Sequence, residues 1–122
     1  MKEKNEITVI LPVHELNDST RPLFNNAVKS VADQQVQPDA FLIVVPKGSD
    51  VAKELKATPP TGAKVIENDG KTDYASQVNF GVENANTEWV SILELDDEYS
   101  KIWFRKVVEY RNAFDNVDIF LP

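Results

Sequence analysis

The chain has 122 residues, 42% of them hydrophobic and 27% charged, which suffices for one packed domain and excludes a disordered chain. Thirteen Lys and Arg against twenty Asp and Glu give a formal charge of −7, which argues against a nucleic-acid surface. The absence of cysteine excludes disulfides and Cys-based zinc sites. Since no apolar run reaches the length of a membrane span, we expect one cytoplasmic domain over residues 1–122 without membrane contact.

Short apolar runs alternate with segments of helical spacing along the whole chain. Pro12 closes the first run and Pro46 the second, as expected at strand ends. Helix caps are available within residues 17–20, at Ser49 or Asp50, at Thr72 or Asp73, and at Ser100. The predicted strands cover residues 7–11, 41–45, 64–67, 89–95 and 117–121, and the predicted helices begin at these caps and end near residues 34, 56, 84 and 114.

This alternation predicts βαβ units with right-handed crossovers. The expected fold is therefore α/β and Rossmann-like, with a mostly parallel sheet of about five strands covered by helices on both faces. The apolar residues of the third helix form one stripe, and large aromatic residues recur at strand and helix spacing, so we expect both sets in the core. These residues are Tyr74, Ala75, Val78, Val82 and Ala85 on the stripe, with Trp89, Trp103 and Phe114 as the aromatic residues.

The run that begins at Trp89 ends in a cluster of carboxylates, at Glu94 and at residues 96–98. In open α/β sheets ligands bind outside the carboxyl ends of the strands, so these acids fall where a site is expected. Clustered carboxylates suit Mg²⁺ or Mn²⁺. The alternative is a solvated acidic loop whose charges favour the N-terminus of the next helix.

The same topology predicts that four loops meet at one edge of the sheet. They carry His14 with Glu15, Lys47, residues 68–70 and residues 94–98. Asp69-Gly70 is first of all a turn, because Gly permits a positive φ.

Five motifs in order resemble the nucleotide-binding half of the GT-A glycosyltransferases of family 2. The family's strand end Pro-x-Tyr-Asn-Glu, its Ser-x-x-x-Gln before Pro, its Asn-x-Gly, its Ala-Arg-Asn-x-Gly helix and its Asp-x-Asp-Asp signature are similar to segments of this chain. These segments are Pro12-Val13-His14-Glu15, then Ser30, Gln34 and Pro38, then Asn68-Asp69-Gly70, Gln77-Val78-Asn79-Phe80-Gly81, and Glu94-Leu95-Asp96-Asp97.

The resemblance implies a metal-dependent glycosyltransferase of the hexosyltransferase type that binds a nucleoside-diphosphate sugar, with a UDP-sugar as the favoured donor. His14 would replace the usual Tyr as the flat partner of the base, and Mn²⁺ or Mg²⁺ would neutralise charge on the departing diphosphate. The implied nucleotide-binding residues are Pro12, Val13, His14, Glu15, Lys47, Asp69, Gly70, Asn79 and Asp96, and the implied metal ligands are Glu94, Asp96 and Asp97.

Departures from the family pattern leave two hypotheses open. Pro46 and Lys47 replace acids that contact the uracil or ribose in the family, although Lys47 could instead meet a phosphate, and Glu94 replaces the first Asp. The chain ends at Pro122, before the half of the fold that supplies the general base and the site for a glycan or protein acceptor. It is then either a minimal or truncated transferase, associated with itself or with an acceptor domain, or a degenerate GT-A-like binding or structural module. No catalytic base is assigned.

Overall fold

The computed structural model describes residues 6–114. The predicted alternation of strands and helices is confirmed, with four strands in this part of the chain, while the fifth strand predicted over residues 117–121 lies outside the described residues. The elements are β1 (Ile7–Pro12), α1 (Arg21–Ala32), β2 (Ala40–Pro46), α2 (Asp50–Ala57), β3 (Lys64–Asn68), α3 (Tyr74–Glu83), β4 (Trp89–Ile92) and α4 (Trp103–Ala113).

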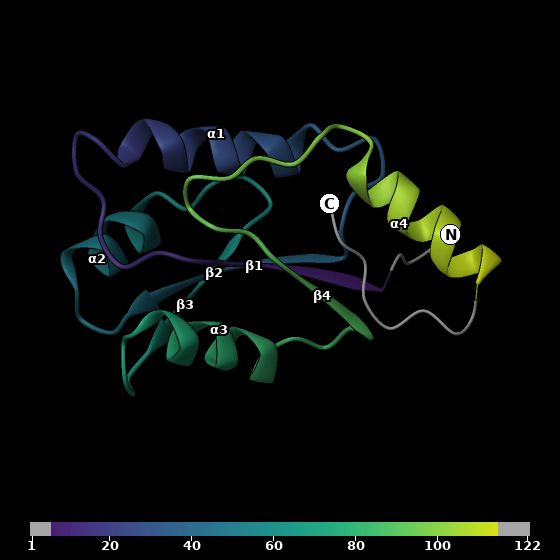
Figure 1. Cartoon of the computed structure of the whole chain (residues 1–122). Coiled ribbons are helices and arrows are strands. Elements are labelled where there is room, and N and C mark those ends of the chain that lie inside the picture. Colours follow the sequence, from purple (N-terminus) through teal and green to yellow (C-terminus); the bar gives the residue numbers. More distant parts are fainter. Residues whose placement is uncertain (1–5, 115–122) are drawn as a thin grey trace.

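The four described strands form one parallel sheet in the order β3-β2-β1-β4. Helices α1, α2 and α4 lie on one side of this sheet, and α3 lies on the other (Figure 1). The chain adds β2 and β3 on one side of β1 and then crosses to add β4 on the other side. The topological switch point, where ligands bind in open α/β sheets, therefore falls between the carboxyl ends of β1 and β4.

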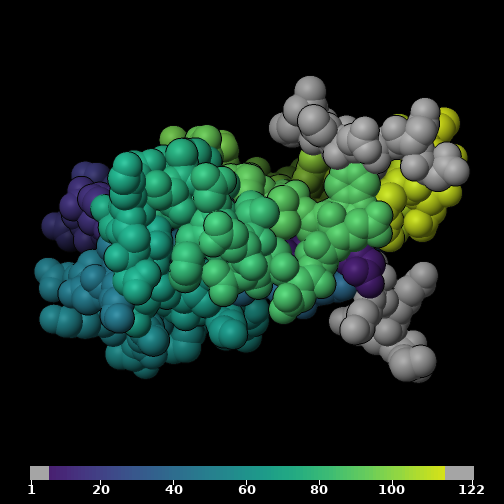
Figure 2. Space-filling view, turned by 90° about the horizontal axis from the view of Figure 1, so that it is seen from below, coloured from purple at the N-terminus to yellow at the C-terminus, as the bar shows by residue number. Residues whose placement is uncertain are grey.

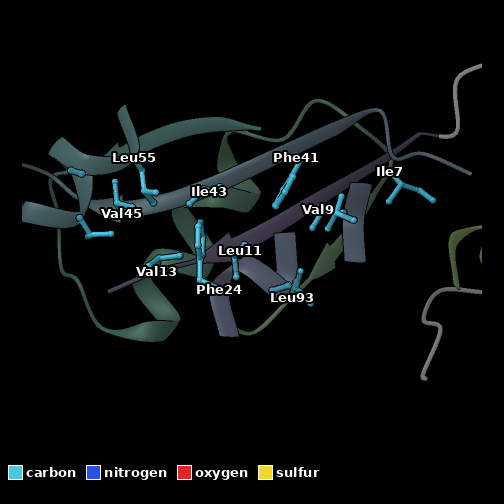
Figure 3. Close-up of a cluster of buried hydrophobic side chains, with 14 of the residues drawn as sticks. Ile7, Val9, Leu11, Val13, Phe24, Phe41, Ile43, Val45, Leu55 and Leu93 are labelled. Carbon is cyan, nitrogen blue, oxygen red and sulfur yellow. The ribbon is translucent and has the colours of Figure 1, made fainter. Parts of the chain in front are cut away.

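The main core fills the space between the sheet and the helices α1, α2 and α4. Alternate residues of β1 and β2 point into it, because successive side chains of a strand face opposite sides. Figure 3 shows Leu11 of β1 and Ile43 of β2 meeting Phe24 of α1 in this layer. Val13 is a fully buried member of the same cluster.

Helix α3 lies directly on the opposite face of the sheet, over β1 and β2. Gly81 makes this possible, because a Cβ atom there would stand 2.6 Å from Ile10 Cγ2 and 3.2 Å from Val44 Cγ2. The buried residues of α3 are Gln77 and Gly81. The expectation that the apolar stripe is buried in the core was therefore wrong. Tyr74, Ala75 and Val82 are exposed, and Val78 and Ala85 are half-buried. Close backbone packing at the glycine, rather than the number of apolar side chains, sets the rotation of the helix.

The strand β4 is shorter and more exposed than predicted. Its sheet pairing ends at Ile92 instead of Leu95, although the Leu93 N–H still donates to Ile10 O at 2.9 Å. Val90 and Ile92 are exposed, because α3 covers β1 and β2 and leaves this side of β4 open among the described residues. Figure 2 views the molecule from that side, with the surfaces of α3 and β4 turned toward the reader.

Two of the predicted helix caps are confirmed by side-chain hydrogen bonds. The Ser49 side chain accepts from Ala52 N at the start of α2, and the Asp73 side chain accepts from Ser76 N at the start of α3. Before α1, Asn17 Oδ1 accepts from the N–H groups of Ser19 and Thr20, which forms the turn that leads into the helix. The Ser49 and Asp73 bonds satisfy N–H groups that a helix start leaves without a backbone partner, whereas α1 begins without a side-chain cap.

The predicted Ser100 cap of α4 was wrong, because the helix begins after Ile102 without a side-chain cap. Gln34, which lies just beyond the end of α1, holds this segment instead. Its Nε2 donates to Ser30 O at 3.0 Å and to Ser100 O at 2.6 Å, and its Oε1 accepts from Phe104 N at 3.1 Å. Phe114, which follows the C-terminal end of α4, is 53% exposed. The prediction that it belongs to the core was therefore wrong.

Candidate nucleotide and metal site

A cavity of about 430 Å³ opens at the carboxyl edge of the sheet. It lies at the switch point between β1 and β4, and its volume falls within the range of about 300–1,000 Å³ found for ligand pockets. Its walls come from the end of β1, the loop before α1, the start of α3 and the loop after β4. The lining residues are Pro12, His14, Glu15, Thr20, Tyr74, Glu94 and Leu95.

Two of the four loops predicted to meet do so in this cavity. His14 and Glu15 after β1 line it together with Glu94 after β4. The sequence had suggested this meeting from strand ends alone, and the paired strands β1 and β4 account for it.

Other predicted nucleotide-binding residues lie outside the lining of this cavity. Lys47 is exposed at the end of β2, where its N–H donates to Asn68 O at 3.0 Å. Asp69 and Gly70 form a turn after β3, in which Gly70 N donates to Asn68 Oδ1 at 3.0 Å. Asn79 is exposed on α3.

Val13 is a special case among the predicted residues, because its side chain is buried in the main core. Its backbone N–H donates to Val44 O at 2.8 Å, so the chain leaves β1 in a fixed direction. Val13 thereby orients the segment that carries His14, without its side chain facing the cavity.

The three predicted metal ligands form one cluster. Ligand oxygens of Glu94, Asp96 and Asp97 all lie within 4.8 Å of one another, and all three residues are exposed. A turn brings them together, in which Asp97 N donates to Glu94 O at 3.0 Å. Carboxylate oxygens are the hard ligands that Mg²⁺ and Mn²⁺ prefer, so this donor set fits such a cation.

Tyr74 connects the cavity to the acidic cluster. Its hydroxyl donates to Glu94 Oε1 at 3.5 Å. Partial burial and the Glu94 carboxylate raise the pKa of the Tyr74 hydroxyl, so the hydroxyl stays protonated and can donate. Tyr74 was not among the site residues predicted from the sequence. Its place at the start of the helix that follows β3 was the available signal, because helices after parallel strands begin at the ligand-binding edge.

A second cavity of about 300 Å³ adjoins the first and shares its wall residues Pro12, His14 and Tyr74. Thr72, Asp73 and Gln77 complete its lining. The hydrogen bonds from the Ser76 hydroxyl and backbone N–H lower the pKa of Asp73, which keeps this capping carboxylate charged. Gln77 begins the segment that resembles the family's helix motif, but it was not among the site residues predicted from the sequence.

These features define an α/β domain with a cavity and an acidic cluster at its topological switch point. The family model "Glycosyl transferase family 2" matches residues 8–120 of the sequence. Because the match spans most of the chain, the chain belongs to glycosyl transferase family 2. A comparison with curated proteins found no match.

Solved structures of glycosyltransferases share the fold. The mannosyltransferase PcManGT from Pyrobaculum calidifontis, solved in complex with GDP-Man and Mn²⁺, is similar with a TM-score of 0.66 at 18% identity, over 87% of this chain and 32% of that one. S. aureus TarS 1–349 is similar with a TM-score of 0.65 at 16% identity, over 88% of this chain and 32% of that one. The S. aureus TarS structure gives a TM-score of 0.66 at 16% identity, over 88% of this chain and 19% of that one.

The chain thus has the Rossmann-like GT-A fold, and it spans about a third or less of the length of these structures. Within residues 6–114, no helix is both long and apolar enough to cross a bilayer.

Proposed function

We propose that this chain is the donor-binding part of a metal-dependent hexosyltransferase that takes a nucleoside-diphosphate sugar, with a UDP-sugar as the first candidate. The observation that carries the proposal is the shared cavity of His14, Glu15 and Glu94, next to the acidic cluster of Glu94, Asp96 and Asp97. A base and a cation-bound diphosphate need two such neighbouring regions. The complex of PcManGT with GDP-Man and Mn²⁺ supports this class of ligand.

The cation would be held by the carboxylates after β4. Mg²⁺ binds oxygen at about 2.0–2.1 Å, so opposite ligands stand about 4 Å apart. The separations of up to 4.8 Å within the cluster come close to this value, and exposed side chains can turn to reach it. A bound Mn²⁺ or Mg²⁺ would supply positive charge for the departing nucleoside diphosphate.

The chain's own residues would bind and orient the donor. His14 and Tyr74 present rings at the cavity wall, where a planar base can stack. Tyr74 would also hold Glu94 at the boundary between base and diphosphate through its hydroxyl. Lys47, Asp69, Gly70 and Asn79 are proposed as outer contacts, with the Lys47 ammonium suited to a phosphate.

Isothermal titration calorimetry with UDP and with GDP, each with Mn²⁺, with Mg²⁺ and with EDTA, tests the proposal. We expect cation-dependent binding, and we expect the double substitution Asp96→Asn, Asp97→Asn to weaken it by at least about tenfold, since each acid is a ligand to a divalent ion. Asp33→Asn is the control, because Asp33 is exposed at the C-terminal end of α1, whereas the cavity is lined by the loop before the N-terminal end of that helix. The proposal would be contradicted if no heat of binding were detected at millimolar nucleotide, or if the double variant bound the nucleotide as tightly as wild type.

A second candidate function is a GT-A-like module with a structural or binding role and no transfer activity. The exposed Val90 and Ile92 on β4 favour it, because an apolar sheet face suits an interaction with another domain or subunit. The same titration separates the two, since this module would fold normally and bind no nucleotide with Mn²⁺. If the chain is instead part of a transferase, a domain or subunit bound at this sheet face would supply the acceptor wall and the general base.

A further inference from the structure

We propose that Gln77 reads the edge of the donor's nucleobase, with its side-chain oxygen accepting a hydrogen bond from a base N–H group. This inference rests on the proposed function and deepens it. Gln77 is 2% exposed and lines the cavity of about 300 Å³ beside His14 and Tyr74. Its Oε1 is buried and has no hydrogen-bond donor within the described part of the chain.

The comparison with Gln34 shows how unusual this oxygen is. Gln34 is also buried, at 5% exposure, yet its Oε1 accepts from Phe104 N and its Nε2 donates to two backbone carbonyls. Buried polar atoms in folded proteins are nearly always paired, because an unpaired one loses its bonds to water without replacement. An orphan acceptor beside a cavity is therefore expected to find its donor in a ligand.

Among the described residues that line this cavity, Gln77 is the one whose buried side-chain oxygen has no partner, and Thr72 adds a second polar side chain to the wall. Pro12 has no N–H group, and His14 and Tyr74 add aromatic rings to the wall, against which a planar base could stack. Both Asp73 oxygens are already engaged, since Oδ2 accepts from Ser76 N at 3.2 Å and Oδ1 accepts from Ser76 Oγ at 2.7 Å. A planar ring with N–H groups on its edge matches these walls, and a nucleobase is such a ring.

The amide can meet a ligand by a small movement. Its terminal torsion is broad and roughly two-fold, so a rotation of the amide can bring Oε1 toward the cavity at low torsional cost. The helix beneath it stays fixed, because Gly81, one turn further along α3, is in direct contact with Ile10 and Val44. Only the end of the side chain has to move when the base enters.

The test compares wild type with Gln77→Leu, a substitution of similar size that removes the acceptor. Both proteins are titrated, with Mn²⁺ present, with UDP, GDP, pyrophosphate, N3-methyl-UDP and N1-methyl-GDP. We expect the leucine variant to bind UDP or GDP about tenfold more weakly and to keep its affinity for pyrophosphate, which has no base. Wild type should discriminate against the methylated base by a similar factor, and the variant should not.

Gln34→Leu is the matched control for stability. Thermal unfolding should show a lower Tm for this variant, because three hydrogen bonds lose their partner, and an equal or higher Tm for Gln77→Leu. If wild type binds UDP or GDP and the Gln77→Leu variant binds it equally well, or loses pyrophosphate affinity to the same extent, this inference alone is overturned. Wild-type protein that tolerates the N-methyl group also overturns it, whatever the variant does. If wild type binds no nucleotide, the proposed function fails and this inference fails with it.

Discussion

The two faces of the sheet differ in what they bury and in what they leave open. The face under α1, α2 and α4 holds the main apolar core, and its buried amide at Gln34 is fully paired. Within residues 6–114, the face under α3 is covered by one helix, leaves Val90 and Ile92 exposed, and buries an oxygen of Gln77 that has no partner. We conclude that stability comes mainly from the first face, whereas the second face leaves apolar side chains exposed and one buried oxygen without a partner among the described residues.

The largest expected difference between the faces is in the cost of removing apolar side chains. Leu11→Ala, at 0% exposure in the main core, should lower the free energy of unfolding by about 2–5 kcal/mol through lost burial and a cavity. Ile92→Ala, at 38% exposure on the open face, should cost less than about 1 kcal/mol. Urea unfolding measures both, and equal losses would remove the distinction between the faces.

Adding a methyl group at Gly81 tests how closely α3 packs on the second face of the sheet. Gly81→Ala should destabilise the protein by about 1–3 kcal/mol, because the new Cβ would overlap Ile10 Cγ2 at 2.6 Å and push the helix from the sheet. Gly70→Ala is the control, since its Cβ would meet only Asn68 Oδ1 at an ordinary 3.4 Å. A Gly81→Ala protein as stable as the Gly70→Ala protein, in the same urea assay, would refute the close packing of α3.

A smaller, pH-dependent effect is expected from Tyr99, which packs against the main core. Burial raises the pKa of Tyr99 to about 12, while its hydroxyl shares a hydrogen bond of 2.5 Å with Ser91 Oγ. Because the folded pKa exceeds the ordinary value of 10, the stability contributed by neutral Tyr99 is complete below pH 10 and is lost as the pH rises through 12.

Tyr99→Phe should therefore cost up to about 1.5 kcal/mol near neutral pH, and the gap to wild type should narrow above pH 10. Urea unfolding at pH 7, 9, 10 and 11 measures this gap. A gap that stays constant up to pH 11 would show that the phenol is not buried in its neutral form.

Much of the fold could be predicted because its signals are local. The apolar runs that end at Pro12 and Pro46 marked two strands, and Ser49 and Asp73 marked two helix starts. Tertiary packing decided the features that were mispredicted. The close contact at Gly81 turns α3 so that its apolar stripe does not face the sheet. The segment before α4 is held by the hydrogen bond from Gln34 to the Ser100 carbonyl, and not by a Ser100 side-chain cap.

The candidate site divides in the same way. The acidic cluster and its meeting with His14 followed from strand order and from the rule for strand ends, which sequence patterns can reveal. Tyr74 could have been placed at the ligand-binding edge from its position at the start of α3. Gln77 could not be assigned in advance, because its role depends on the rotation of α3 and on which amide finds a partner. Such pairings arise between segments that are distant in sequence.

A crystal structure of the protein soaked with UDP or GDP and Mn²⁺, with anomalous data collected for manganese, tests the central claim most directly. The account predicts an anomalous peak between the carboxylates of Glu94, Asp96 and Asp97, a diphosphate beside it, and a base against His14 and Tyr74. Nucleotide bound elsewhere, or manganese bound away from these carboxylates, would contradict it.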